Sequence, residues 1–240
     1  MHRRRRSLVI ALMALTLPAM QSAAAAAPAP DSPNEKDKDR VLHQLDVAAA
    51  SFRTVSADFV FDTEQVDPVP DTDIQKGTVY YERKGSSFSM AAHISQVNKR
   101  VLTRVYGFFG GAFKLYDKVT NQVTRFSKAG KFESYIMLGF GASGKDLEQK
   151  WNIRYLGSET IDGIKTEKLE LVAKDEEVRK VITKVTIWID PERAVSLKQR
   201  FDEGPDTYRI CTYSHFKLNQ PLPADAFKLS TDSQTQFVDR

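Results

Sequence analysis

The amino-acid sequence predicts a mainly β fold, in which an incomplete, strongly curved antiparallel β-barrel of about eleven strands is covered by an N-terminal helix and a mid-chain helical or loop lid. Three observations lead to this prediction. Runs that alternate apolar and polar residues recur at short spacing between residues 55 and 216. No long helical pattern separates these runs, which favours antiparallel connections. A sheet with so many strands also tends to curl on itself.

The first 27 residues are typical of a signal peptide. Arg3 to Arg6 precede an apolar run, Leu8 to Leu17, and an alanine tract then offers A-x-A cleavage sites. The run is too short to span a bilayer comfortably, although an uncleaved anchor is an alternative. We therefore expect a cleaved signal peptide over 1–27, a linker over 28–36 and a single periplasmic domain over 37–240. The arginines leave both Sec and twin-arginine export open.

Charge and cysteine content exclude two classes of protein. The formal net charge of +4 comes from the arginines of the first segment, and the remaining chain is neutral. A nucleic-acid-binding protein would keep a basic excess, so we expect no nucleic-acid partner. The single cysteine, Cys211, cannot form an internal disulfide, which fits the bacterial periplasm better than a disulfide-rich secreted scaffold.

The mature chain is expected to open with a helix and to continue with strands. The helix is indicated by an apolar stripe at helical spacing, formed by Val41, Leu42, Leu45, Ala48, Ala49 and Phe52. After residue 54 the period changes to two. The strands expected next cover residues 55–63 and about 74–84, 86–94, 98–107, 112–117 and 121–127.

Residues 130–150 interrupt the strands with an apolar cluster, Tyr135–Phe140, and a short polar helix capped by Ser143. Strands resume at Trp151, and Asp162-Gly163 indicates a hairpin. In one later strand, a single face is expected to consist of Val181, Thr183, Val185, Ile187 and Ile189. After a turn at 190–193 come a strand with Val195, Leu197 and Phe201 and a last strand with Tyr208, Ile210, Thr212, Ser214 and Phe216.

The sequence carries no recognisable catalytic or metal-binding motif. His43, His93 and His215 are far apart, phosphate-binding glycine motifs are absent, and the acidic residues are scattered among lysines. We therefore expect no enzyme, no metal and no cofactor. A large apolar concavity in an exported protein is instead typical of a container for apolar ligands.

Four stretches resemble the LolA-type periplasmic lipoprotein carriers over about residues 38–238. They are the helix running into Val55–Phe61, the strand pair Gly77–Arg83 with Phe88–Met90, the hairpin Phe113–Asp117 with Asn121–Thr124, and the closing motif Leu222–Phe227. The resemblance implies a monomer that takes acylated lipoproteins from an inner-membrane ABC lipoprotein-release complex to an outer-membrane acceptor. It departs from the family at Lys84, where the family has proline, and by one extra residue near Gly85 and Ser86.

The resemblance also implies roles for individual residues. Arg83 matches an arginine that hydrogen-bonds the lid and holds it shut. The lid itself is expected to comprise Leu42, Leu45, Phe52, Ile136, Met137, Leu138 and Phe140. Inward side chains of the strands would then line the cavity, namely Phe59, Phe61, Val79, Tyr81, Phe88, Met90, Leu169, Leu171, Val185 and Ile187.

Three other functions remain open on the sequence. One is a periplasmic sensor domain of related fold that binds lipoproteins or a membrane regulator. Another is carriage of a different lipid, because the cavity chemistry would be shared. An enzyme on the same scaffold would need a polar cluster inside the barrel, where we expect little beyond Thr183, Thr212 and Ser214.

Overall fold

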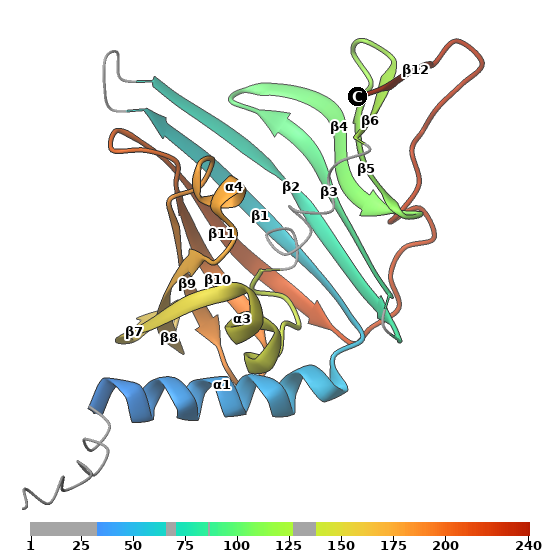
Figure 1. Ribbon diagram of the computed structural model, residues 1–240. Helices are drawn as coiled ribbons and strands as arrows, with labels where there is room; N and C mark the ends of the chain where they lie inside the picture. The colour runs from blue at the N-terminus through green and yellow to red at the C-terminus, as the bar shows by residue number, and fades with distance from the viewer. Residues whose placement is uncertain (1–32, 66–70, 86, 127–137) are drawn as a thin grey trace, which may run out of the picture. The chain divides into compact units, whose positions relative to one another are not determined.

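A computed structural model describes residues 33–65, 71–85, 87–126 and 138–240 and confirms the mainly β fold (Figure 1). Within these residues, twelve strands form one sheet in the order β12-β6-β5-β4-β3-β2-β1-β11-β10-β9-β8-β7. The edge strands β12 and β7 are not neighbours in this order, so the curved sheet stays open. The strands are β1 (Thr54–Gln65), β2 (Asp71–Lys84), β3 (Ser87–Val97), β4 (Arg100–Phe109), β5 (Ala112–Asp117), β6 (Gln122–Phe126), β7 (Trp151–Ile161), β8 (Ile164–Ala173), β9 (Lys184–Asp190), β10 (Val195–Asp202), β11 (Thr207–Leu218) and β12 (Gln236–Asp239).

The sheet consists of two meanders, β1–β6 and β7–β11, which antiparallel pairing of β1 with β11 joins. The eleven expected strands correspond to β1–β11. The twelfth, β12, was not expected, because it is a short segment at the chain end that pairs in parallel with β6. The described helices are α1 (Pro33–Ser51), α3 (Gly144–Lys150) and α4 (Glu176–Arg179). None of them is both long and apolar enough to cross a membrane.

Helix α1 lies across one end of the sheet, beneath β7–β11 (Figure 1). Its expected apolar stripe is confirmed, because Val41, Leu42 and Leu45 are all buried. The helix begins at Pro33, so the described part of the expected 28–36 linker is helical. A proline is compatible with the first turn of a helix, where its missing N–H would have no partner anyway.

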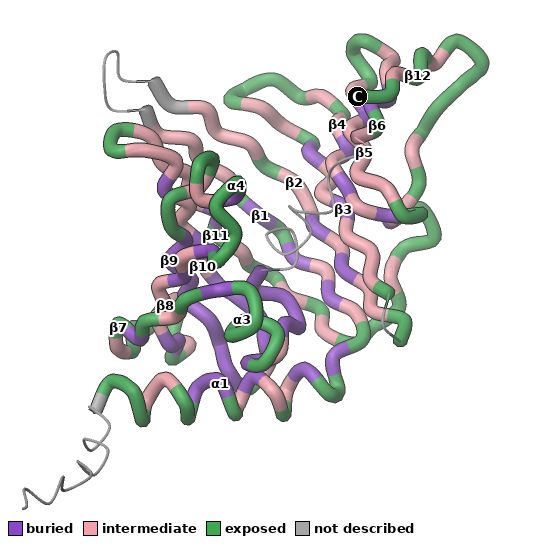
Figure 2. Tube along the Cα trace, in the orientation of Figure 1, coloured by how far each residue is buried: buried purple, intermediate pink, exposed green. Residues whose placement is uncertain are grey.

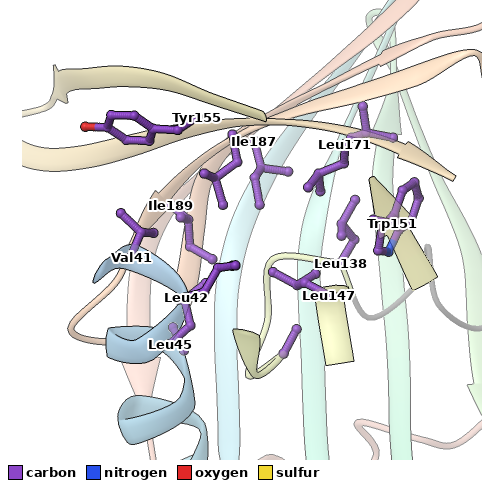
Figure 3. Packing of buried hydrophobic residues seen from close by; sticks show 14 of the residues in the cluster. Val41, Leu42, Leu45, Leu138, Leu147, Trp151, Tyr155, Leu171, Ile187 and Ile189 are labelled. Carbon is purple, nitrogen blue, oxygen red and sulfur yellow. The ribbon is translucent and has the colours of Figure 1, made fainter. Parts of the chain in front are cut away.

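The stripe of α1 packs against β7, β8, β9 and α3 in what we call the helix-side core (Figure 3). Helix α3 has the expected cap, in which the Ser143 hydroxyl accepts from the Asp146 amide at 3.0 Å and the Asp146 carboxylate accepts from the Ser143 amide. A second cluster lies around β1, β2 and β11. A third joins β3–β6 to Phe227 and Leu229 of the C-terminal segment. Figure 2 shows buried residues concentrated where α1 and α3 meet the sheet.

The strand expected to begin at Val181 begins instead at Lys184. Before it, Asp175 caps the short helix α4 by accepting from the Glu177 amide at 2.8 Å. Val181 is 48% exposed and therefore belongs to no strand face. Thr183, expected inside the barrel, is exposed and bonds the carbonyl of Asp202. The expected strand face therefore does not include Val181 and Thr183, because β9 begins only at Lys184.

The inward face of β11 is also different from the expected one. The register between β1 and β11 shifts between Ser56 and Asp58, opposite His215, whose φ is 52°. This β-bulge reverses the alternation of side chains on either side of it. As a result, Thr212 and Ser214 do not face the interior. The inward residues before the bulge are Arg209, Cys211 and Tyr213.

Candidate apolar ligand cavity

A cavity of about 290 Å³ lies against the inner face of β1–β4 and β11. Its volume is close to the lower end of the range of small-molecule sites, and its mainly apolar, aromatic wall is typical of them. Five of the residues expected at the cavity lie there: Phe59, Phe61, Val79, Tyr81 and Met90. The other lining residues are Gln75, Ala92, Ile94, Tyr106, Arg209, Cys211 and Tyr213.

Strand register brings these side chains together. Phe59 is paired with Gly77 on β2 and with Tyr213 on β11, so residues distant in sequence form one row across the sheet. Gly77 is required here, because a Cβ at this position would collide with the carbonyl of His93 on β3.

Four other residues expected at the cavity do not line it. Leu169, Leu171, Val185 and Ile187 have no exposed surface and belong to the helix-side core, where α1 covers β8 and β9. The alternating pattern of a strand marks an inward face, but it does not distinguish a face filled by a helix from one left open. Phe88 does not line the cavity either, and stacks on Phe108 at a ring distance of 5.2 Å.

Residues Leu138–Ala142 include the expected lid residues Leu138 and Phe140 and pack on one end of the cavity wall, and we call them the lid segment. Its Phe140 stacks on Tyr81 with ring centroids 4.3 Å apart and meets the edge of Tyr213 at 4.8 Å. Phe140 is 1% exposed. Ile136 and Met137 lie outside the described residues.

Backbone and side-chain hydrogen bonds fasten the lid segment to β10. The Gly141 amide donates to the Ala194 carbonyl at 2.8 Å, and the Ser196 amide donates to the Gly139 carbonyl at 2.6 Å. The buried Gln199 side chain donates to the Leu138 carbonyl. The Tyr213 hydroxyl in turn donates to the Gln199 amide oxygen at 3.0 Å, which links this fastening to the cavity wall.

Arg83 on β2 adds a further hydrogen bond to the lid segment. Its guanidinium Nη2 donates to the Gly141 carbonyl at 2.8 Å, and its backbone amide donates to the Arg53 carbonyl at 2.7 Å. The residue that the sequence singled out therefore contacts the lid segment. Whether that contact controls opening stays a prediction.

The α1 residues expected in the lid occupy two different places. Leu42 and Leu45 belong to the helix-side core. Phe52, just after the helix, packs with Phe140 and Tyr81 in the second cluster. Its ring lies so close to Gly141 that any Cβ there would collide with it, and Gly141 has a φ of 64° that favours glycine.

Burial keeps the thiol and two of the tyrosine hydroxyls of the cavity wall uncharged. It raises the pKa of the Cys211 thiol to about 12, although a hydrogen bond with Tyr213 acts in the opposite direction. Burial likewise raises the pKa values of the Tyr81 and Tyr213 hydroxyls. The thiolate is the reactive form of cysteine, so burial makes the Cys211 thiol a poor nucleophile at neutral pH.

The opposite end of the cavity is polar, and sequence reasoning missed it. Arg209 and Gln75 line that end. A further polar side chain that the sequence analysis did not single out, Gln199, is at the lid end and bonds the lid segment. Gln199 could have been found, because it interrupts the apolar face of Val195, Leu197 and Phe201. Arg209 could not, because its inward direction depends on the bulge at His215. In the described part of the chain, no three His, Cys, Asp or Glu side chains are grouped as metal ligands.

Comparisons with known proteins give fold similarity and one distant relative. No family model matches the chain. An uncharacterized protein of Methanocaldococcus jannaschii is 30% identical over 119 residues, which are 50% of this chain. The chain spans about a third of the length of that relative, since the matched share of it is 33%.

Among solved structures, an uncharacterized conserved protein from Thermus thermophilus matches 85% of this chain and 99% of its own, at 10% identity and a TM-score of 0.54. The two chains therefore share a fold. Matches at lower scores include a LolA superfamily protein from Nitrosomonas europaea, with 16% identity, 80% and 97% coverage and a TM-score of 0.39. They also include the MucA/MucB complex of Pseudomonas aeruginosa, with 10% identity, 80% and 61% coverage and a TM-score of 0.44.

Proposed function

We propose that this protein is a periplasmic carrier that shields the acyl chains of lipoproteins, or of another lipid, while they move from the inner to the outer membrane. The observation that carries the proposal is the mainly apolar cavity on the inner face of the open sheet, against whose wall the lid segment packs. The sequence motifs that resemble the LolA-type carriers support it. Binding and release, without catalysis, are the activity proposed.

The physics of transfer between membranes favours such a site. Burying each methylene of an acyl chain gains about 0.8 kcal/mol, and a bilayer offers the same gain. A carrier must therefore bind chains about as well as lipid does, so that it can load and unload. A few hydrogen bonds hold the lid segment in place. Movement of the lid segment would enlarge the apolar surface available to an acyl chain, which fits a site that must both load and unload.

The proposal names partners that the resemblance implies. The donor would be an inner-membrane ABC lipoprotein-release complex, and the receiver an outer-membrane acceptor. The carrier itself would act as a monomer, exported by its N-terminal signal peptide.

Native mass spectrometry of the mature protein, purified gently from periplasm and followed by lipid extraction, tests this function. A co-purifying acylated lipoprotein would support the carrier, and a free lipid would move the assignment to transport of that lipid. A protein that is empty and also takes up no fluorescent acyl probe would overturn both. The alternative of a periplasmic sensor domain would then be favoured.

A variant that fills the cavity gives a second test. Ala92 lines the cavity, so Ala92→Trp should place an indole where the acyl chain binds and lower the affinity for a fluorescent acyl probe by about tenfold or more. Val101→Trp is the matched control, because Val101 lies on β4 and is 90% exposed. Equal binding by the folded Ala92→Trp variant and the control would contradict the assignment of this cavity.

A further inference from the structure

The cavity is amphipathic along its length. At the end beneath the lid segment, Tyr81 on β2 is paired with Met90 on β3. Farther along the sheet, Phe61 on β1 is paired with Gln75 on β2. One step beyond, Thr63 is paired with Arg209 on β11. The wall thus runs from aromatic and aliphatic groups at the lid end to an amide and a guanidinium at the other end.

Arg209 at the polar end has a hydrogen-bond donor to spare. Its Nη2 pairs with the Glu203 carboxylate at 2.5 Å, and its guanidinium lies 5.9 Å from the centre of the Phe61 ring. Its Nε is buried and has no hydrogen-bond partner among the described residues. Buried donors are normally satisfied by protein, water or ligand, so this nitrogen is a place for an acceptor oxygen that the protein does not supply.

The charges around Arg209 decide which oxygen fits. Glu203 already neutralises the guanidinium. A second carboxylate, Asp73, lies on β2 and accepts from the Gln75 amide at 3.2 Å. An anionic head group at Arg209 would be repelled by the Glu203 carboxylate and would gain little from a cation that is already paired. A neutral carbonyl oxygen accepts from Nε without that repulsion.

We propose that the polar end of the cavity binds the uncharged ester or amide carbonyl of an acylated ligand, with the acyl chain running toward the lid segment. The inference rests on the proposed function, because it assumes that the cavity binds acyl chains, and it adds the chemical class and the direction of the ligand. Arg209 and Gln75 would select acyl esters and amides over free fatty acids of the same chain length.

A pair of matched ligands tests the selection. Methyl laurate and laurate share one chain and differ in the charge of the head group at pH 8. Each is titrated below its micellar concentration against the purified full mature chain, by displacement of a fluorescent acyl probe. We expect the ester to bind about tenfold more tightly, an effect that one nearby like charge produces in partly screened surroundings.

Two variants locate the effect. Glu203→Gln removes the paired carboxylate and should shift the preference toward laurate, because the guanidinium then lacks its counter-ion. Arg209→Met should lower the affinity for methyl laurate several-fold. The affinities for an ester and for an alkane-like probe should then differ little. Arg154→Met is the matched control, since Arg154 pairs with Glu170 on the β7–β8 surface, away from the cavity lining.

The outcomes separate the inference from the proposed function. Probe binding with laurate as tight as methyl laurate, or with no change in the folded Glu203→Gln variant, would overturn the inference and leave the acyl carrier intact. Failure of the wild-type protein to bind any acyl probe would overturn both. A preference of the wild-type protein for the ester, reversed in the Glu203→Gln variant, would support the inference even if Arg209→Met does not fold.

Discussion

At the scale of single residues, Arg83 of β2 and Gln199 of β10 donate hydrogen bonds to the Gly141 and Leu138 carbonyls of the lid segment. Arg83→Met keeps much of the side-chain length and removes the donor. We expect the lid segment to open more often, so the uptake rate of a fluorescent acyl probe should rise several-fold, with a stability loss of about 1–2 kcal/mol. Stopped-flow fluorescence and urea unfolding measure the two effects.

The exposed arginine of β4, Arg100, supplies the control through Arg100→Met. If Arg83 has only a structural role, Arg83→Met will lower stability and leave the uptake rate unchanged. That result would refute the role of Arg83 as a latch. The sequence led to Arg83 only through the family resemblance. An arginine at a strand end has no local signal that shows which carbonyl it will meet.

At the scale of elements, a buried carboxylate fastens α1 to the sheet. Glu167 on β8 accepts from the Tyr155 hydroxyl at 2.7 Å and the Ser158 hydroxyl at 2.8 Å, both on β7, and from Arg40 of α1 at 3.2 Å. Desolvation alone would raise the pKa of Glu167, but these hydrogen bonds and the charge of Arg40 lower it below its ordinary value of 4.5. A lowered pKa in the folded state stabilises the fold at pH values above the ordinary pKa.

The stability from Glu167 should therefore be complete at neutral pH and should be lost as the pH falls below about 4.5 through the lowered pKa. Glu167→Gln should reduce the free energy of unfolding at pH 7 by about 1–3 kcal/mol and flatten the acid limb of its pH profile. Urea unfolding at several pH values checks this, with Glu176→Gln as the exposed control. An unchanged acid limb in Glu167→Gln would show that another group is responsible.

Period and turn chemistry predicted most of the elements. The helical stripe of α1, the β7–β8 hairpin at Asp162-Gly163 and the Ser143 cap all depend on local sequence. The bulge at His215 does not, because a histidine at positive φ has no distinctive neighbours in the chain. One extra residue there changes the inward face of β11 and brings Arg209 to the cavity.

At the scale of the whole molecule, the sheet has one filled half and one hollow half. Helix α1 covers strands β8 and β9, where Leu169, Val185 and Ile187 have no exposed surface. Strands β1–β4 and β11 border the cavity. Apart from Gln75 and Arg209, the inward side chains at the cavity are mainly apolar as well, so the difference arises chiefly from where α1 lies.

This asymmetry predicts how the molecule opens. Regions with few buried apolar contacts open at lower free energy, so backbone amides of β3 and β4 should exchange with solvent faster than those of β8 and β9. Saturating methyl laurate should slow exchange in β1–β4 and β11, by up to about 100-fold at 100 times the dissociation constant, and leave β8 and β9 little changed. Hydrogen exchange followed by mass spectrometry, with Ala92→Trp as the variant that fills the cavity, resolves the two halves. Equal protection of both halves by the ligand would place the binding site elsewhere, because a ligand in the cavity touches only the hollow half.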